Sequence, residues 1–543
     1  MDAQSTVSVR QYVDDSTDTD TAAFQRAVDT CAESGGGTVV VPAGEYVIGT
    51  LHLRSHVTLE LVAGATVFAA VDEAAYDDDR IGPDGERPFV VADGVKNVSI
   101  EGRGTFDGRG TDIMLMETPI QGHSNESGAH PLVSNGRHRA RQGEAYLDRS
   151  AGTDGWPVAK PDFRPGPMFL FEGCEDVLLR GITLRDMPAW TVSVHDSAEV
   201  DISGVDIDNH MRIPNCDGIS VMNSRNVHIS DCTIRACDDA ITVGTLAESD
   251  RPTEGITVSN CTLSSSACAI KFGSETARDI RNCTFENCVV TESNRGLGIQ
   301  HRDGGDVENV LFSNVVVETH LLPGPWWGKA EPIYVTSVPR DASTTVGSVR
   351  NVRFSNVVAR SENGALVYAH EEADVSRVRF DAVDIEIRDS LHADAVGGNF
   401  DLQPTSVFPP IQKRAIAALH VENVEDAELC DVSVRWSETV PDYYENGLRC
   451  VGVDGLVVDG FSGRQAHDGA TAAAIDLRET ATVSVRNSRA QPGTEVFLSA
   501  TDLGDARLFA GNDLGDATVG IEGEAGFETS GNYPLSRPTD ELL

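Results

Sequence analysis

Short apolar segments recur along most of the chain at nearly constant intervals. From about residue 179, one apolar residue is followed by a second three positions later and a third two positions beyond that. This frame occupies Leu179/Ile182/Leu184, Ile202/Val205/Ile207, Ile229/Cys232/Ile234, Val258/Cys261/Leu263, Phe285/Cys288/Val290, Phe312/Val315/Val317, Phe354/Val357/Ala359 and Phe380/Val383/Ile385. Successive first positions are 23, 27, 29, 27, 27, 42 and 26 residues apart. Such a repeat predicts a solenoid whose turns pack on one another.

Apolar and polar residues alternate in these segments, as in strands with one buried face. The residue before the second apolar position is Asp231, Asn260, Asn287, Asn314 or Asn356 in five copies. Stacked Asn side chains can form hydrogen bonds from coil to coil at a turn. The pattern therefore predicts an all-β parallel β-helix. We expect it to be right-handed because crossover connections between parallel strands are right-handed.

The N-terminal part has a helical pattern. Residues 18–34 place Phe24, Ala27, Val28 and Cys31 on one face, with Asp20 or Thr21 as N-cap and three glycines after the helix. Because a solenoid needs its open end covered, we expect this helix to be a cap. The predicted organisation is an N-terminal segment with the capping helix at 1–36, the β-helix at 37–525 and a tail at 526–543.

Two long inserts interrupt the repeat, at 115–167 and 390–414. Long segments without a repeat pattern in a compact fold are often functional. The first is locally basic in an acidic chain, which favours a functional role. Its basic residues include Arg137, His138, Arg139, Arg141, Lys160 and Arg164.

Two copies of one pattern hold the candidate catalytic residues. Asp217 and Asp239 each precede an alternating strand by two residues, and the two copies are 22 residues apart. On adjacent coils, about 4.8 Å apart, these acids and Asp238 would share one patch. A lone Asp before a strand is commonly a turn residue, but three clustered carboxylates repel one another and raise the pKa of at least one. A protonated acid beside ionised ones is what glycosidic cleavage requires.

The strands that follow these acids predict a groove for a sugar chain. Alignment of the four strands places small residues in one outward row and hydrogen-bonding residues in the next. The small row is Gly218, Ala240, Ala269 and Gly298, and the polar row is Ser220, Thr242, Lys271 and Gln300. Trp326-Trp327 could stack on sugar or pack beneath a loop. His210 and Arg212 could also reach this groove.

The cysteines favour a structural interpretation. Cys232, Cys261 and Cys288 occupy the second apolar position, which valine fills in other copies. We therefore expect them in the core as small apolar side chains, and not as zinc ligands or disulfides.

The composition indicates which binding partners and which cellular environment suit this chain. With 85 acidic and 43 basic residues the net charge is −42, and only five of the basic residues are lysine. Such a composition is typical of proteins adapted to concentrated salt, which screens self-repulsion, and nucleic acid is an unfavourable partner for it. No leader pattern follows Met1, and no apolar run is long enough to span a bilayer. With 11 cysteines, an odd number, we expect a cytoplasmic protein with reduced thiols and no membrane association.

The combination Asn215-x-Asp217-Gly with Asp238-Asp239 resembles the signatures of glycoside hydrolase family 28, the polygalacturonase family. The resemblance extends to Asp20-Thr21, to Arg164-Pro165 and to Arg295-Gly296. It implies a right-handed, pectin-lyase-like β-helix that hydrolyses glycosidic bonds with inversion, with no cofactor or metal.

By position, the resemblance implies that Asp238 is the general acid, that Asp217 and Asp239 share the base role, and that Asn215 contacts the substrate. Inversion implies carboxyl groups about 6.5–9.5 Å apart.

The chain departs from the family's pattern at two places. Cys268-Ala269 stands where the family has His-Gly. Gly298 and Gln300 stand where it has the Arg and Lys that hold a galacturonate carboxylate. Lys271 could replace one of these cations. We therefore expect a rhamnogalacturonan-type or other uronate- or deoxysugar-containing oligosaccharide as substrate.

Two other functions fit the same fold. A polysaccharide lyase would use the acids to hold calcium, with an Arg or Lys as base. A non-catalytic carbohydrate-binding solenoid would need the groove alone. The oligomeric state stays open.

Overall fold

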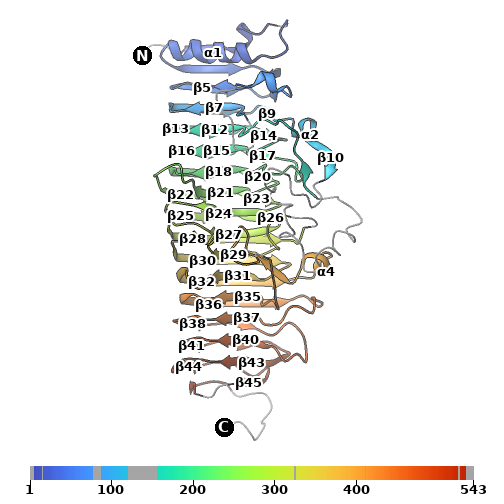
Figure 1. Ribbon diagram of the computed structural model, residues 1–543, viewed down its shortest axis with the longest axis vertical. Coiled ribbons are helices and arrows are strands. Elements are labelled where there is room, and N and C mark those ends of the chain that lie inside the picture. Colours follow the sequence, from blue (N-terminus) through green and yellow to red (C-terminus); the bar gives the residue numbers. More distant parts are fainter. Residues whose placement is uncertain are drawn as a thin grey trace.

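The computed structural model describes residues 5–14, 16–77, 87–119, 156–322, 326–409, 411–523 and 526–533. The chain coils into one elongated column of stacked strands, with its two ends at opposite ends of the column (Figure 1). None of the helices in these ranges has the length and apolar character needed to cross a bilayer. The predicted all-β solenoid is confirmed.

Two long parallel sheets form the walls of the column in the described residues. One has 15 strands: β4 (Leu51–His52), β7 (Val90–Asp93), β12 (Phe169–Glu172), β15 (Val192–His195), β18 (Ile219–Met222), β21 (Ile241–Thr245), β24 (Cys268–Thr276), β27 (Arg295–His301), β29 (Ile333–Ser337), β31 (Ala365–Ala369), β35 (Leu419–Glu422), β37 (Leu448–Val451), β40 (Ala473–Arg478), β43 (Thr494–Thr501) and β45 (Ala517–Gly523).

The other sheet has 27 strands: β1 (Ser5–Ser8), β2 (Gly37–Val41), β3 (Gly44–Ile48), β5 (Val57–Leu61), β6 (Ala65–Ala69), β8 (Lys96–Gly102), β9 (Thr105–Asp107), β13 (Glu175–Arg180), β14 (Thr183–Arg185), β16 (Ala198–Ser203), β17 (Asp206–Asp208), β19 (Arg225–Ser230), β20 (Thr233–Ala236), β22 (Thr253–Ser259), β23 (Thr262–Ser265), β25 (Ile280–Glu286), β26 (Val289–Ser293), β28 (Val307–Thr319), β30 (Ser348–Ser361), β32 (Asp374–Ile387), β36 (Glu425–Trp436), β38 (Leu456–Asp459), β39 (Ser462–Gly463), β41 (Thr482–Arg486), β42 (Arg489–Ala490), β44 (Ala506–Ala510) and β46 (Glu528–Ser530).

The apolar frame of the sequence is the interior of this column. Its first positions pair in register from Leu179 to Phe380, so that each sits directly on the next. Phe312 stacks on Phe354 with ring centroids 5.0 Å apart, and Phe354 on Phe380 at 5.1 Å. The predicted repeat and its register are therefore confirmed over this stretch.

An asparagine ladder runs along one edge of the coils, as predicted. Asn314 Nδ2 donates to Asn287 Oδ1 over 3.2 Å, and Asn356 Nδ2 donates to Asn314 Oδ1 over 2.8 Å. Asn260 donates to Asp231 in the same way over 3.3 Å. All five residues have positive φ, a backbone conformation that Asn tolerates better than most residues. Asn therefore serves both the turn and the hydrogen bonds between coils.

The N-terminal helix α1 (Thr21–Glu33) lies across the first end of the column (Figure 1). Its buried face contains the expected Phe24, Ala27, Val28 and Cys31. Asp20 is the N-cap residue, but its carboxylate accepts a hydrogen bond from the backbone N–H of Val47 instead of capping the helix. The acid thus ties the helix to β3, and the capping role of the helix is confirmed.

The three core cysteines stand where the pattern placed them. Cys232, Cys261 and Cys288 are each at most 2% exposed, and their thiols are free. They lie in the apolar core, which supports the interpretation as small hydrophobic side chains.

The two inserts project from the coils. In the first, β10 (Leu115–Pro119) pairs antiparallel with β11 (Val158–Ala159). The four basic positions predicted at 137–141 lie outside the described residues. The second contains helix α4 (Ala393–Val396) and the antiparallel pair β33 (Asn399–Asp401) and β34 (Ile411–Lys413). The other short helical elements are η1 (Val9–Gln11), η2 (Glu73–Ala75) and α2 (Gly110–Ile113).

Candidate active site

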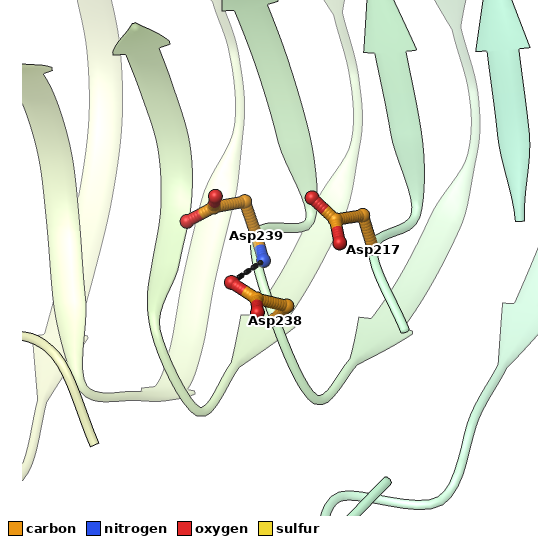
Figure 2. A group of neighbouring side chains, drawn as sticks. All are labelled: Asp217, Asp238 and Asp239. Atoms are coloured by element: carbon orange, nitrogen blue, oxygen red, sulfur yellow. Dashed lines mark hydrogen bonds between the residues drawn. The ribbon is translucent and has the colours of Figure 1, made fainter. Parts of the chain in front are cut away.

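The three predicted acids lie together at the N-terminal ends of β18 and β21, two neighbouring strands inside the 15-stranded sheet. Asp217 and Asp239 occupy equivalent positions just before β18 and β21, and Asp238 lies on the turn beside them (Figure 2). One oxygen of each carboxyl group lies within 4.8 Å of the others. Asp238 also accepts a hydrogen bond from the backbone N–H of Asp239, over 3.1 Å. The acids therefore form one cluster, as the 22-residue spacing predicts.

The close approach of the two coils explains the small residue after Asp217. The N–H of Gly218 donates to the carbonyl of Asp239 over 2.9 Å. A Cβ atom on Gly218 would lie 2.3 Å from the carbonyl oxygen of Ala240, which no side chain permits. Glycine here lets the strands of the two acids stack without a gap.

The predicted register is correct for three strands and wrong for the fourth. Ser220 pairs with Thr242, and Thr242 with Lys271. Lys271, however, pairs with Gly298, and Gln300 pairs with Gly273. The strand is shifted by two residues, so Gly296, rather than Gly298, continues the row of small residues. A shift of two leaves every side chain on the same face, so the apolar pattern could not reveal it.

A cavity of about 280 Å³ opens over the acids. Its polar side includes the three aspartates, Asn215, Ser220, Thr242 and Lys271, and its apolar side includes Trp190, Met222, Leu246, Trp326 and Trp327. Gln300 does not line it. Aromatic faces opposite hydrogen-bonding groups are the arrangement that binds the faces and hydroxyls of a sugar ring.

Lys271 is held inside this cavity by Asp239. Its Nζ donates to Asp239 Oδ2 over 2.5 Å, with 12% of the lysine side chain and 3% of the aspartate side chain exposed. Burial raises the pKa of Asp239 to about 6, although the charge of Lys271 acts to lower it. Burial opposes the charge on Lys271, but the aspartates outweigh it, so the pKa of the lysine is also raised. The pair is therefore ionised at neutral pH.

Asp217 forms no such ion pair with the residues that the structure describes. Burial, followed by the charges of Asp238 and Asp239, raises the pKa of Asp217 well above its usual range. Its Oδ1 is buried without a hydrogen-bond partner among the described residues, and so is Oγ1 of Thr242 in the same cavity. Buried polar atoms normally have partners, so both atoms are available to a ligand's hydroxyl groups.

Asn215 lines the cavity, and the side chain of Arg164 lies beside it. The buried guanidinium donates to the carbonyls of Pro188 and Pro214 over 2.8 Å each and reaches Asn215 Oδ1 at 3.5 Å. Arg164 therefore holds the loop that presents Asn215. His210 and Arg212, which the sequence left open, do not line the cavity.

Several residues of the cavity were not predicted. Trp190, Met222, Leu246 and Glu275 line it but come from loops and strand ends that carry no repeat signal. Loop positions become neighbours only after the coils stack, so a sequence pattern gives no means of finding them.

The three acids approach closely through one oxygen each. These nearest carboxyl oxygens lie within 4.8 Å of one another. The expected separation of about 6.5–9.5 Å refers to whole carboxyl groups, and it stays a prediction. The stereochemistry of cleavage stays a prediction.

These features define a parallel β-helix with a carboxylate-lined cavity on one sheet. The sequence matches the family described as "Glycosyl hydrolases family 28" over residues 31–393. The chain therefore belongs to glycoside hydrolase family 28.

Known proteins resemble the chain at moderate identity. A probable polygalacturonase of Vitis vinifera is 26% identical over 226 residues, which are 41% of this chain and 40% of that protein. An exo-poly-alpha-D-galacturonosidase of Dickeya chrysanthemi is 23% identical over 302 residues, 50% of this chain and 48% of that protein. The chain thus spans about half the length of the curated relatives it matches.

Among solved structures, a family 28 exopolygalacturonase of Yersinia enterocolitica superposes with a TM-score of 0.58 at 21% identity. The superposition covers 84% of this chain and 79% of the Yersinia chain. At that identity the likeness shows the fold: a right-handed parallel β-helix.

Proposed function

We propose that the protein is an inverting glycoside hydrolase that cleaves pectin-derived or related oligosaccharides. The observation that carries the proposal is the cluster of Asp217, Asp238 and Asp239 in a cavity with aromatic and hydroxyl-bearing walls. Family membership supports it, and the names of the relatives point to pectic substrates.

The three acids take different roles in this proposal. Asp239, paired with Lys271, is ionised and accepts the proton of the attacking water, with Asp217 beside it. Asp238 is half-buried, whereas Asp217 and Asp239 are buried, and it lies on the turn beside them (Figure 2). There it donates a proton to the glycosidic oxygen. The raised pKa of Asp217 supports a second assignment, in which Asp217 is the donor.

A leaving-group experiment separates the two assignments. Asp→Asn variants at 217, 238 and 239 are each assayed on a natural oligosaccharide and on a nitrophenyl glycoside, whose leaving group needs no proton. We expect loss of about 10²–10⁴-fold on the natural substrate for each variant. Only the variant that lacks the proton donor should keep activity on the nitrophenyl glycoside. Wild-type rates for all three variants would overturn the proposal.

Inversion is tested directly by the anomeric form of the first product. NMR of a fresh reaction should show the anomer opposite to that of the cleaved bond. Retention of the anomeric form of the cleaved bond would overturn this part of the proposal.

The charges that line the cavity favour a substrate whose sugar at the cleavage position has no carboxylate. Lys271 is its one basic residue among those that the structure describes, and this lysine is already paired. Four carboxyl groups, including Glu275, line the same cavity and repel an anionic ring. A rhamnogalacturonan-type oligosaccharide therefore fits better than polygalacturonate. Faster hydrolysis of rhamnogalacturonan oligosaccharides than of oligogalacturonides is expected, and the reverse order would contradict it.

The lyase alternative is tested in the same assay. Three clustered carboxylates could also hold a calcium ion, but Lys271 already places a positive charge at Asp239. A hydrolase forms no unsaturated product and keeps its rate with a calcium chelator. An ultraviolet-absorbing product that depends on calcium would favour the lyase.

We further propose that the protein works in concentrated salt inside the cell. The net charge of −42 supports the first part, because salt screens self-repulsion. The eleven free thiols support a reducing compartment. Activity and melting temperature should both rise with KCl concentration, and fractionation of the source cells should place the protein in the cytoplasm.

A further inference from the structure

The outer face of the 15-stranded sheet is covered next to the cavity. Residues that point outward from β27 and β29 would line a continuous groove if nothing lay on them. Instead Gln300 is 2% exposed and Tyr334 is 0% exposed. The cover is the second insert, which lies beside these strands as the orange segment near α4 in Figure 1. We call its residues 399–406 the wall.

Backbone carbonyls of the wall bind two buried arginines of the sheet. Arg302 donates to the carbonyls of Leu402, Gln403 and Pro404 over 3.0, 3.2 and 3.1 Å. Arg295 donates to the carbonyl of Asp401 over 3.3 Å. Both guanidiniums are at most 2% exposed. Because a buried charge left without partners is strongly unfavourable, these bonds hold the wall firmly on the sheet.

Asp401 connects the wall to the cavity. Its Oδ2 accepts from the N–H of Gly328 over 3.1 Å, and its Oδ1 accepts from the N–H of Gln403 over 3.0 Å. Its carbonyl accepts from the hydroxyl of Tyr334 over 2.7 Å. Gly328 follows directly on Trp326 and Trp327, which line the cavity. A hydrogen bond therefore joins the wall to the segment that carries the two tryptophans.

The wall begins close to the acids. β24 is the single strand between β21, which follows Asp239, and the covered β27. Two strand spacings amount to about 10 Å, and the cavity of about 280 Å³ is at the lower end of the usual range for ligand sites. A saccharide chain that lies along the sheet over Asp217 would therefore meet the wall at β27.

We infer that the protein acts on the ends of saccharide chains, with Asp401 as a positioning residue that sets this mode. The inference rests on the proposed function. A terminal sugar enters the cavity and abuts Trp326 and Trp327, which the wall holds through Gly328, while the rest of the chain leaves on the other side of the acids. The products are then short terminal fragments, released one after another.

End-capped substrates test this with the unmodified protein. Long rhamnogalacturonan and galacturonan oligosaccharides are prepared uncapped, with an aromatic amine on the reducing end, with alkyl ethers on the non-reducing sugar, and with both caps. We expect hydrolysis of the uncapped chains, a loss of at least about 100-fold with one of the single caps, and the same loss with both caps. Internal cleavage of doubly capped chains at the uncapped rate would overturn the inference and leave the hydrolase function intact. No hydrolysis of any substrate would overturn the proposed function and the inference with it.

Variants of the wall give a second readout. Asp401→Ala removes both carboxylate bonds, and we expect internal fragments to appear among its products. Asp394→Asn, an exposed change in α4 of the same insert, is the control and should release terminal fragments only. A folded Asp401→Ala protein, judged by its circular dichroism, with the wild-type product pattern would remove Asp401 from the inference.

Discussion

Lys271 and Asp239 form an ion pair at the centre of the acidic cluster. The Nζ–Oδ2 distance is 2.5 Å, and both side chains are largely withdrawn from water. The two residues come from consecutive coils, 32 positions apart in the sequence. The charge of Lys271 lowers the pKa of both Asp239 and Asp217, so the pair influences which carboxyl groups of the cluster are ionised.

Removal of this charge should shift the pH dependence of catalysis. Asp239 acts as a base when ionised, so activity rises with pH through its pKa of about 6. In Lys271→Met the charge that lowers this pKa is lost, and the acidic limb of the kcat/KM profile moves to higher pH. At pH 6 we expect a loss of at least about 10-fold. Lys271→Arg keeps the charge and should keep the limb near its original position. An unshifted limb in Lys271→Met would exclude Asp239 as the ionised base.

The crowded carboxyl groups should make the fold less stable as pH rises. The pKa of Asp239 is raised in the folded state from 3.8 to about 6, and that of Asp217 is raised well above its usual range. Well below pH 4 both are protonated in either state. As pH rises above about 4 the unfolded chain ionises first, so stability falls until the pH has passed the folded pKa. Asp239 alone accounts for about 3 kcal/mol of this change.

Asp217→Asn tests this explanation. The variant should melt higher than the wild type at pH 7.5, and by a smaller margin at pH 5, in calorimetry at one salt concentration, while its hydrolysis of the natural substrate is lost. The exposed Asp442→Asn is the matched control and should leave both melting temperatures unchanged. Equal stability of Asp217→Asn and wild type at pH 7.5 would contradict the raised pKa.

The asparagine ladder should contribute through both hydrogen bonds and backbone conformation. Asn314 bonds to Asn287 and Asn356 and has a φ of 54°. Asn314→Ala loses both bonds and puts alanine in a left-handed backbone conformation that Asn tolerates better, so we expect about 2–3 kcal/mol of destabilisation in urea unfolding. Asn314→Gly loses the bonds alone and should be destabilised by about 1 kcal/mol less. If alanine were tolerated as well as glycine, the backbone part of the explanation would be wrong.

The core cysteines should be replaceable by valine. Cys261 is 1% exposed and occupies a position that Val315 and Val357 fill on other coils. Cys261→Val therefore keeps an apolar side chain of similar size and should change the free energy of unfolding by less than about 1.5 kcal/mol. Metal chelators should leave the melting temperature of the wild type unchanged. A chelator-induced fall that is absent from Cys261→Val would show that the thiols bind metal.

Much of the fold could be predicted because the repeat is a local property. Short stretches of sequence are enough to recognise three features: the apolar position that contains Leu179 and Phe380, the ladder at Asn314 and the buried face of α1. Each follows from the spacing of apolar and polar residues within its own segment. The cluster of Asp217 and Asp239 follows from the same repeat, since equal positions on adjacent coils must stack.

Other features depend on distances that no local pattern contains. The two-residue shift of Gln300 leaves its side chain on the same face of the sheet, so the alternation of apolar and polar residues does not reveal the shift. The contact between Asp401 and Gly328 joins segments 73 positions apart, neither of which belongs to the repeat.

The sequence by itself therefore determined the coil, its core and the meeting of three acids, because each depends on periodic residues a fixed number of positions apart. Only the tertiary structure decided that Lys271 pairs with Asp239 and that an insert covers the sheet at β27. The ion pair depends on how far the lysine side chain extends, and the covering of β27 depends on the path of a loop. Neither can be read from the spacing of the sequence repeat.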